Sequence, residues 1–421
     1  MKNNPPKPIH TEGGASVEGD INTQGGDFVG RDKIELNIYS YFRATPGQLR
    51  RSFDALMKDK LRGFVGRQFI FDALDGFLRT HDSGYFILRG APGIGKSAFM
   101  AKLINDRGYI HHFNIASQNI HSTRAFLENV IAQLIKQYDL PHKELPPRAF
   151  DDSGFLMQCL NEAAAKREQS EDRVIIAIDA LDEANRRDLD PSANILFLPQ
   201  SLPEGVYVVV TTRPLDDLPL QVMQQETLDF EEKEYKAGNL QDITTYIKAY
   251  LQREGMGGRL SAWDVTQEQF IAGLRKKSQG NFMYLYHVLP AIEQGKFVHG
   301  TLDELPDGLK AYYQRHWRQM RAGNEDEFDQ IYEPIVCILG VAREPVTVQQ
   351  IANWTKLSQG KVKKSIRLWR EFLNKEQLEG ELHYRIYHAS FQDFLKDQVD
   401  LDRYDDMVID YYLALAGLND K

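Results

Sequence analysis

The residues most able to do chemistry form the segment Gly90-Ala-Pro-Gly-Ile-Gly-Lys-Ser97, which fits the pattern G-x-x-x-x-G-K-[ST]. Glycines at these spacings let backbone N–H groups curve around phosphate oxygens without interference from a Cβ atom. Lys96 supplies a positive charge for the β- and γ-phosphates, and the hydroxyl of Ser97 is a ligand for Mg²⁺. The nucleotide-binding residues predicted in this loop are Gly90, Pro92, Gly93, Ile94, Gly95, Lys96, Ser97 and Ala98.

A second group of reactive residues follows the apolar run at 174–178: Asp179 ends the run, and Asp182 and Glu183 come shortly after it. An acid at the carboxyl end of a buried strand lies beside the phosphate loop in sheets of this type. Asp179 is therefore the second predicted Mg²⁺ ligand, with Ser97. Asp182 or Glu183 could orient or deprotonate the attacking water, or could cap the next helix, and the sequence does not choose between them.

A third polar group, Thr211-Thr212-Arg213-Pro214, ends the apolar run that begins at Val206. From a neighbouring strand, Arg213 could reach a γ-phosphate and so respond to its presence. The alternative is an ordinary arginine at a strand end, surrounded by solvent. The predicted catalytic residues are Asp179, Asp182, Glu183 and Arg213.

The elements that must position these residues alternate in type up to about residue 230. Strands are predicted at 85–88, 110–115, 174–178 and 206–211. Helices are predicted at 49–61, 68–78, 97–103, 123–138 and 155–167. Continuous apolar strands suit a parallel sheet that is covered on both faces, so the alternation indicates a doubly wound α/β domain.

Beyond residue 235 the pattern becomes helical, with predicted helices at 240–251, 267–277, 283–292, 303–320 and 328–339. Two short helices at 347–353 and 361–373 then precede a strand at 382–387 and two final helices, an order typical of a winged helix. The predicted fold is therefore an α/β P-loop NTPase sheet followed by a helical domain and a winged-helix domain. The predicted boundaries are 46–230 for the nucleotide-binding domain, 231–300 for the helical domain and 301–421 for the winged helix and C-terminal helices.

Residues 1–45 form a predicted N-terminal arm that is rich in Gly, Asn and Asp. An imperfect repeat within it pairs GGASVEGD, from Gly13, with GGDFVGRD, from Gly25. This composition favours a flexible arm. The alternative is a β-forming segment that stacks with copies from other chains, since short β-prone stretches of low charge can do so.

Composition excludes several classes of protein. Of the 421 residues, 42% are apolar and 26% are charged, as in folded domains. The formal net charge is −9, so binding to nucleic acid would need a local basic patch. Two cysteines, Cys159 and Cys337, cannot form a disulfide framework or a four-thiolate zinc site. The N-terminus has no apolar leader and no run approaches about 18 apolar residues, so we expect a cytoplasmic protein without a membrane span.

The order and spacing of GAPGIGKS, IDALDEA and TTRP resemble those of STAND-class P-loop NTPases, particularly the NACHT type, over about residues 60–400. Gly63-Phe-Val-Gly66-Arg67 is similar to the adenine-side motif of the class. The resemblance implies that Val65 touches the base and that Gly66 and Arg67 shape that edge of the pocket. The segment Tyr387-His388-Ala-Ser-Phe391 resembles a winged-helix signature, which implies that His388 reaches the β-phosphate and latches a closed, ADP-bound state.

The resemblance implies a slow, regulated ATPase that uses ATP, ADP and Mg²⁺ as a switch in NLR-like immune, antiviral or cell-death signalling, including that of bacteria. With ADP the outer domains cover the site, exchange for ATP rotates them and leads to self-association, and hydrolysis resets the switch. The implied partners are an unidentified trigger, further copies of the chain and an effector recruited through the N-terminal arm. Gly280-Asn281-Phe282 takes the place of the helical-domain loop of the class, with Phe282 where many members have proline.

Two alternative functions are considered. A DNA-associated AAA+-like ATPase would apply its winged helix to a duplex, with a basic face made of Lys361, Lys363, Lys364, Arg367 and Arg370. Such a run is more often a solvated surface, so nucleic acid is not the expected partner. The other alternative is a scaffold that holds nucleotide without turning it over. No guanine-reading Asn/Thr-Lys-x-Asp pattern stands out, which favours adenine.

Overall fold

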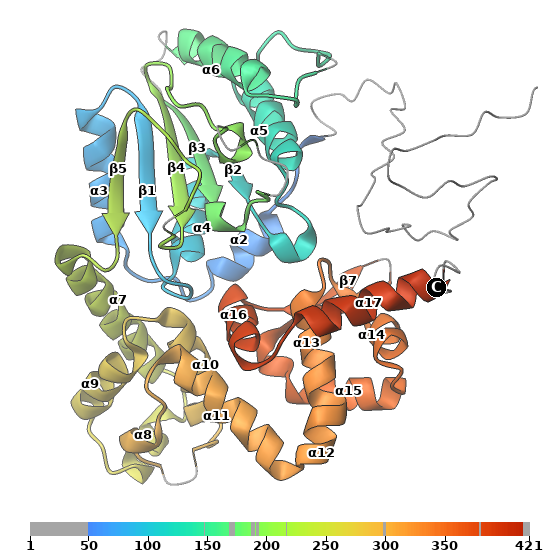
Figure 1. The fold of residues 1–421 in the computed structure, drawn as a ribbon. Coiled ribbons are helices and arrows are strands. Elements are labelled where there is room, and N and C mark those ends of the chain that lie inside the picture. Colours follow the sequence, from blue (N-terminus) through green and yellow to red (C-terminus); the bar gives the residue numbers. More distant parts are fainter. Residues whose placement is uncertain are drawn as a thin grey trace, which may run out of the picture.

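The computed structural model describes residues 49–146, 148–167, 173–186, 190, 193–215, 217–297, 300–378 and 380–415. The predicted arm at 1–45 lies outside the described residues. We name three parts of the chain: the P-loop domain (54–230), the helical lobe (233–305) and the C-terminal lobe (308–415). The helix α7 leads from the sheet of the P-loop domain into the helical lobe, and the C-terminal lobe lies beside the helical lobe (Figure 1).

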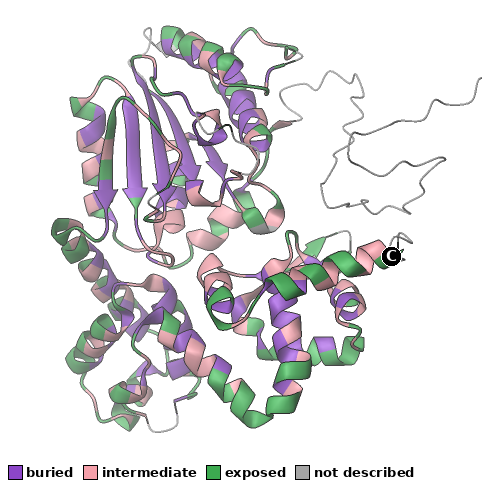
Figure 2. Cartoon of the chain, viewed as in Figure 1, coloured by how far each residue is buried: buried purple, intermediate pink, exposed green. Residues whose placement is uncertain are grey.

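The P-loop domain is built on a parallel sheet of five strands in the order β2-β3-β4-β1-β5. The strands are β1 (Gly84–Arg89), β2 (Ile110–Phe113), β3 (Val174–Asp179), β4 (Val206–Thr212) and β5 (Gln225–Asp229). Every residue of β3 and β4 is buried, as their continuous apolar runs predict (Figure 2). The predicted α/β fold with a parallel sheet is therefore confirmed.

Helices cover both faces of this sheet. One face packs against α2 (Asp54–Lys60), α3 (Gln68–Thr80) and α4 (Lys96–Arg107). The other face packs against α5 (Thr123–Gln137) and α6 (Gly154–Arg167). Alternate residues of β1 enter different cores, because side chains along a strand point to opposite faces: Phe86 faces the α3 side and Tyr85 the α5 side. Short 3₁₀ turns follow at η1 (Ala116–Gln118), η2 (Leu181–Glu183) and η3 (Ile195–Phe197).

The helical lobe contains α7 (Lys233–Leu251), α8 (Met256–Ala262), α9 (Gln267–Ser278), α10 (Phe282–Glu293) and the turn η4 (Leu302–Glu304). The start of α9 is a capping box, in which Thr266 and Gln269 each accept a hydrogen bond from the backbone N–H of the other. The start of α10 is capped by Asn281, whose side chain accepts from the N–H of Tyr284. Both starts are therefore specified locally by the sequence.

The C-terminal lobe begins with α11 (Gly308–Gly323), α12 (Glu325–Glu327), the π-turn η5 (Phe328–Tyr332) and α13 (Glu333–Val341). It continues with β6 (Val346–Thr347), α14 (Val348–Thr355), α15 (Gln359–Leu368), η6 (Arg370–Phe372), β7 (Leu373–Leu378), β8 (Glu381–Ile386), α16 (Ala389–Gln398) and α17 (Asp402–Leu415). Its three strands form an antiparallel sheet in the order β6-β8-β7. This order of elements is compatible with the predicted winged helix, which stays a prediction.

Three strands were not predicted from the sequence: the two-residue strand β6 and the polar strands β5 and β7. β5 lies at the edge of the large sheet beside β1, and only its last two residues are buried. β7 pairs with β8, and the predicted helix at 361–373 is wrong at its end because α15 stops at Leu368. An edge strand with one solvated face lacks the apolar run that identifies a buried strand.

The helical lobe and the C-terminal lobe share one continuous apolar core, whereas the P-loop domain has two cores of its own. His287 of α10 stacks on Tyr312 of α11, with ring centres 5.4 Å apart, and lies 5.4 Å from the ring of Phe372. Among the described residues, no helix has both the length and the apolar character needed to cross a membrane.

Candidate nucleotide-binding site

The phosphate loop occupies the turn between β1 and α4, where its backbone needs glycine. Gly93 and Gly95 have φ angles of 82° and 102°, in the left-handed region that other residues rarely adopt. Gly95 is the N-cap of α4, so the loop leads directly into the first turn of a helix. The free N–H groups and positive dipole end of that turn form an anion-binding position.

The ammonium group of Lys96 folds back onto its own loop. It donates to the carbonyl oxygens of Gly90 at 2.6 Å and Ala91 at 3.1 Å. Burial lowers the pKa of Lys96 to about 8, and the carboxylates of Asp182 and Asp179 oppose that shift. A lysine held in this way has lost much of its water and is placed to exchange carbonyl partners for phosphate oxygens.

Asp179 ends β3 beside the phosphate loop, as the sequence predicts. It is 4% exposed, and one carboxylate oxygen accepts from the Thr211 hydroxyl at 2.6 Å. Burial raises the pKa of Asp179, while hydrogen bonds from Thr211 and Ser97 act in the opposite direction. The Ser97 hydroxyl and the Asp179 carboxylate therefore lie within contact of one another, and such hard oxygen donors fit Mg²⁺.

Asp182 and Glu183, which the sequence left equivalent, have different partners. Asp182 is paired with Arg213: its carboxylate lies 2.8 Å from Nε and also accepts from the Arg213 backbone N–H at 3.2 Å. Glu183 accepts only a backbone hydrogen bond, from the N–H of Ala116 at 3.1 Å, among the contacts given for the described residues. Burial raises the pKa of Glu183 to about 7, so this carboxylate titrates near neutral pH.

Arg213 also reaches the C-terminal lobe. Its Nη1 atom lies 2.6 Å from a carboxylate oxygen of Asp393 on α16. The guanidinium thus bridges an acid of the P-loop domain and an acid of the C-terminal lobe, and its side chain is 22% exposed. Because both partners are charged side chains, a phosphate group could compete with them for the arginine.

His388 begins α16 as its N-cap. Its Nδ1 atom accepts from the backbone N–H of Ser390 at 3.1 Å and lies 2.7 Å from the Ser390 hydroxyl. Burial holds the pKa of His388 well below its usual value, and the cations Lys60, Arg213 and Lys96 lower it further. We infer a neutral ring with its proton on Nε2, which leaves that N–H able to donate to a phosphate.

One cavity of about 900 Å³ collects these groups, with walls from the P-loop domain and both lobes. Its size is that of a typical small-molecule site. The predicted residues that line it are Val65, Arg67, Pro92, Gly93, Gly95, Lys96, Ser97, Ala98, Asp179, Asp182, Glu183, Arg213 and His388. Three predicted residues lie behind this lining: Gly66 packs on Asp242, Gly90 packs on Phe230, and Ile94 is buried.

Arg67 has a more specific position than the resemblance implies. It is 2% exposed and joins the P-loop domain to the helical lobe: Nη1 donates to Asn239 at 2.7 Å, the backbone N–H donates to Asp242 at 2.9 Å, and Nη2 donates to the Ile94 carbonyl. Its guanidinium carbon lies 4.6 Å from the centre of the Phe282 ring. Burial lowers the pKa of Arg67 to about 10. The guanidinium is thus occupied by protein partners at the junction.

The segment 281–283 contacts the phosphate loop through backbone atoms. The N–H groups of Phe282 and Met283 both donate to the carbonyl of Gly93, at 3.0 and 3.1 Å, and the Asn281 side chain donates to the carbonyl of Pro92 at 2.9 Å. A Cβ on Gly93 would lie 2.6 Å from the Asn281 side chain. The start of α10 therefore rests directly on the loop.

Sequence reasoning missed several residues of the site. Lys60, Tyr286 and Asp393 line the cavity, and no local motif identifies them. Thr211 was visible within the polar end of β4 but had no predicted partner. A strand-end hydroxyl facing a strand-end acid on the adjacent strand was the available signal, since β3 and β4 are neighbours.

The fold and the site define a P-loop nucleotide-binding protein. Residues 72–213 match the family model described as Nephrocystin 3, N-terminal, a stretch that contains the phosphate loop, Asp179 and Arg213. This match confirms the resemblance to STAND-class P-loop NTPases for the nucleotide-binding domain. No curated protein matches the sequence.

Two solved structures show a remote likeness. A STAND ATPase with a tetratricopeptide repeat sensor from Pyrococcus horikoshii is 14% identical, with a TM-score of 0.41, and the match covers 84% of this chain and 45% of that one. The RuvB Holliday junction branch migration motor of Thermotoga maritima is 14% identical, with a TM-score of 0.28, and the match covers 81% of this chain and 94% of that one. This chain thus spans less than half the length of the archaeal STAND protein.

Proposed function

We propose that this chain binds ATP and ADP with Mg²⁺, hydrolyses ATP slowly and acts as a signalling switch. The observation that carries the proposal is a cavity that combines a phosphate loop, a buried acid and residues of both outer lobes. A ligand in this cavity would touch every part of the described chain at once. Such contacts are what allow a ligand to shift a conformational equilibrium.

Binding would use the loop first. The phosphates would take the place of the Gly90 and Ala91 carbonyls at Lys96 and would accept from backbone N–H groups at the start of α4. Ser97 and Asp179 would hold Mg²⁺, which when bound neutralises charge on the phosphates. The aromatic residues Tyr246 and Phe282 line the same cavity and offer apolar surface to a purine.

For hydrolysis we assign the role of general base to Glu183. Its pKa of about 7 allows it to accept a proton from water at neutral pH, whereas Asp182 is engaged by Arg213. Arg213 would be drawn from Asp182 and Asp393 toward the γ-phosphate, where its charge stabilises the transferring group. The same movement would loosen the link to α16.

For switching, we assign to His388 a preference for ADP and to Arg213 a preference for the γ-phosphate of ATP. With ADP, the Nε2 proton of His388 would bind the β-phosphate and keep the C-terminal lobe in place. With ATP, the γ-phosphate would compete for Arg213 and weaken that placement. The shift is limited to the difference in affinity between the two states, so an effect of tenfold requires about 1.4 kcal/mol.

We propose further that the open state self-associates in response to a trigger and recruits an effector through the N-terminal arm, in immune or antiviral signalling. The STAND resemblance supports this part of the proposal. The DNA alternative finds less support: within the basic face of α15, Lys364 is already paired with Glu327 at 2.5 Å.

The test is to identify the nucleotide carried by the purified protein and to measure its mass with and without ATP. We expect bound ADP or ATP and a larger assembly after activation. Lys96→Ala should abolish nucleotide binding in calorimetry while the protein stays folded. Unchanged ATP affinity in this variant would show that the phosphate loop is misassigned.

A further inference from the structure

Lys60 is a cation in the nucleotide cavity that the phosphate-loop motif does not include. It is the last residue of α2, and its side chain lines the cavity together with Lys96. Its ammonium nitrogen lies 5.0 Å from the centre of the Tyr387 ring, which stacks on Tyr286 at 5.2 Å. Lys60 thus stands where the P-loop domain, the C-terminal lobe and the helical lobe meet.

Among the described residues, no acid is a direct partner of the Lys60 ammonium. Within the part of the chain that the structure describes, it forms no hydrogen bond and no ion pair within 4.0 Å. The acids that face it, Asp59, Asp179 and Glu183, act only at longer range, and the charge of Arg385 opposes them. Loss of water is the largest influence on its pKa, which is lowered. A half-buried cation whose nearest contact is an aromatic ring rather than an acid is available to an anionic ligand.

Lys60 lies where its ammonium can contact a polyphosphate bound in the cavity. Lys60, Arg213 and Lys96 all act electrostatically on the His388 ring, although they come from α2, the end of β4 and the phosphate loop. Three cations from separate elements therefore act on one neutral donor at the edge of the cavity. Lys96 and Arg213 already have phosphate roles in the proposed function, and Lys60 faces the same space.

We propose that Lys60 is a further phosphate-binding residue, which contacts the polyphosphate of the nucleotide from α2. The inference rests on the proposed nucleotide site and adds a residue to it. Before phosphate binds, the ammonium rests on the Tyr387 ring. A charge-assisted contact to phosphate is stronger than a cation–π contact at a partly exposed ring, so the ammonium leaves the ring when phosphate arrives.

The experiment compares Lys60→Met with Lys58→Met in the full chain. Both changes remove one positive charge from α2, but Lys58 is exposed and does not line the cavity. Titration with fluorescent ATP and ADP should show affinity about ten- to a hundredfold weaker for Lys60→Met and unchanged for Lys58→Met. Lys60→Arg should retain most of the affinity, because it keeps the charge.

A second measurement distinguishes the contribution of the phosphates to binding from that of the nucleoside. For each protein we compare the concentration of inorganic tripolyphosphate that displaces half of the labelled ADP with the concentration of adenosine that does the same. This ratio should be equal in Lys58→Met and the unaltered protein. In Lys60→Met it should be at least tenfold higher. Equal competition in both variants would overturn the role of Lys60. If the unaltered protein binds no nucleotide at all, the proposed function itself fails, and that outcome is distinct. Circular dichroism of each variant establishes that it is folded.

Discussion

The P-loop domain meets the two outer lobes through junctions of different chemistry. Its junction with the helical lobe is buried and uses backbone groups: the Gly93 carbonyl accepts two N–H groups from the start of α10, and Arg67 is enclosed by Asn239 and Asp242. Its junction with the C-terminal lobe uses half-exposed charged side chains, such as the pair of Arg213 with Asp393, whose side chain is 45% exposed. The first junction is buried and the second is half-exposed, although residues of both line the cavity.

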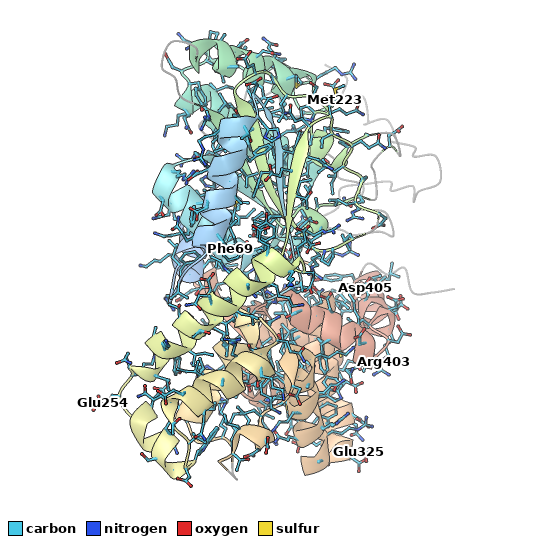
Figure 3. All side chains as sticks on the ribbon, turned by 90° about the vertical axis from the view of Figure 1, so that its left-hand side faces the viewer. Phe69, Met223, Glu254, Glu325, Arg403 and Asp405 are labelled. Carbon is cyan, nitrogen blue, oxygen red and sulfur yellow. The ribbon has the colours of Figure 1, made fainter. Side chains whose placement is uncertain are left out.

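Aromatic packing strengthens the first junction. Phe69 of α3 lies edge-on to Phe230 and stacks with Tyr235, at the point where α3 meets α7 (Figure 3). Gly238 permits this contact, since a Cβ there would lie 2.7 Å from the Phe69 ring. Burial of aromatic rings does not depend on a bound anion.

The difference between the two junctions indicates which lobe can separate from the P-loop domain when a nucleotide binds. Phosphate can compete for charged side chains but not for backbone hydrogen bonds beneath the loop. We therefore expect the helical lobe to stay with the P-loop domain and the C-terminal lobe to move, rather than both outer domains rotating together. Movement must also open the contact between His287 and Tyr312, because the two lobes share a core.

The largest expected effect tests the buried junction. Arg67→Ala would leave the buried Asp242 and Asn239 without their partner, so the free energy of unfolding should fall by about 3–5 kcal/mol. Urea denaturation measures the change. Arg79→Ala, at an exposed position of α3, the helix that begins directly after Arg67, is the matched control and should alter stability by less than about 0.5 kcal/mol. Similar values for both variants would break the comparison.

An intermediate effect is expected in the pH dependence of the ATPase rate, which should follow Glu183 and not the buried junction at Arg67. Glu183 must be deprotonated to act as base, so with a pKa of about 7 the ATPase rate should rise about tenfold from pH 6 to pH 8 and fall again as the solution is acidified. Arg67, with a pKa of about 10, keeps its charge over this range. Steady-state phosphate release measures the rate. A flat profile, or one that persists in Glu183→Gln, would contradict the assignment of the base.

The smallest expected effect tests the charged junction. Asp393→Ala removes an acid that is more than one-third exposed, so stability should change by only about 0.2–1 kcal/mol. Hydrogen exchange at 388–393 should nevertheless rise by up to about fivefold, because the tie to the P-loop domain is lost. Asp397 lies on α16, as Asp393 does, but it pairs with Lys310 of α11, inside the C-terminal lobe. Asp397→Ala should therefore leave hydrogen exchange at 388–393 unchanged. Equal exchange in the two variants would count against a separable lobe.

The sequence predicted the parts of the site that depend on local geometry. A loop of fixed spacing between a strand and a helix specifies Lys96 and Ser97, and an acid at the end of a buried strand specifies Asp179. The partner of Arg213 on α16 could not be predicted, because it lies 180 residues away and depends on how the lobes pack. β5 and β7 were missed for a simpler reason, since their polar residues carry no burial pattern.

The lowered pKa of Lys96 offers a chemical means of detecting whether the cavity is occupied. An amine with a pKa of about 8 is roughly half uncharged at pH 8, and uncharged amines react with acylating reagents, whereas an ordinary exposed lysine is almost wholly protonated there. Phosphate oxygens would keep the proton on this nitrogen and shield it. Mass spectrometry of acylated peptides could therefore count loaded molecules directly, even in a cell extract where turnover is too slow to follow.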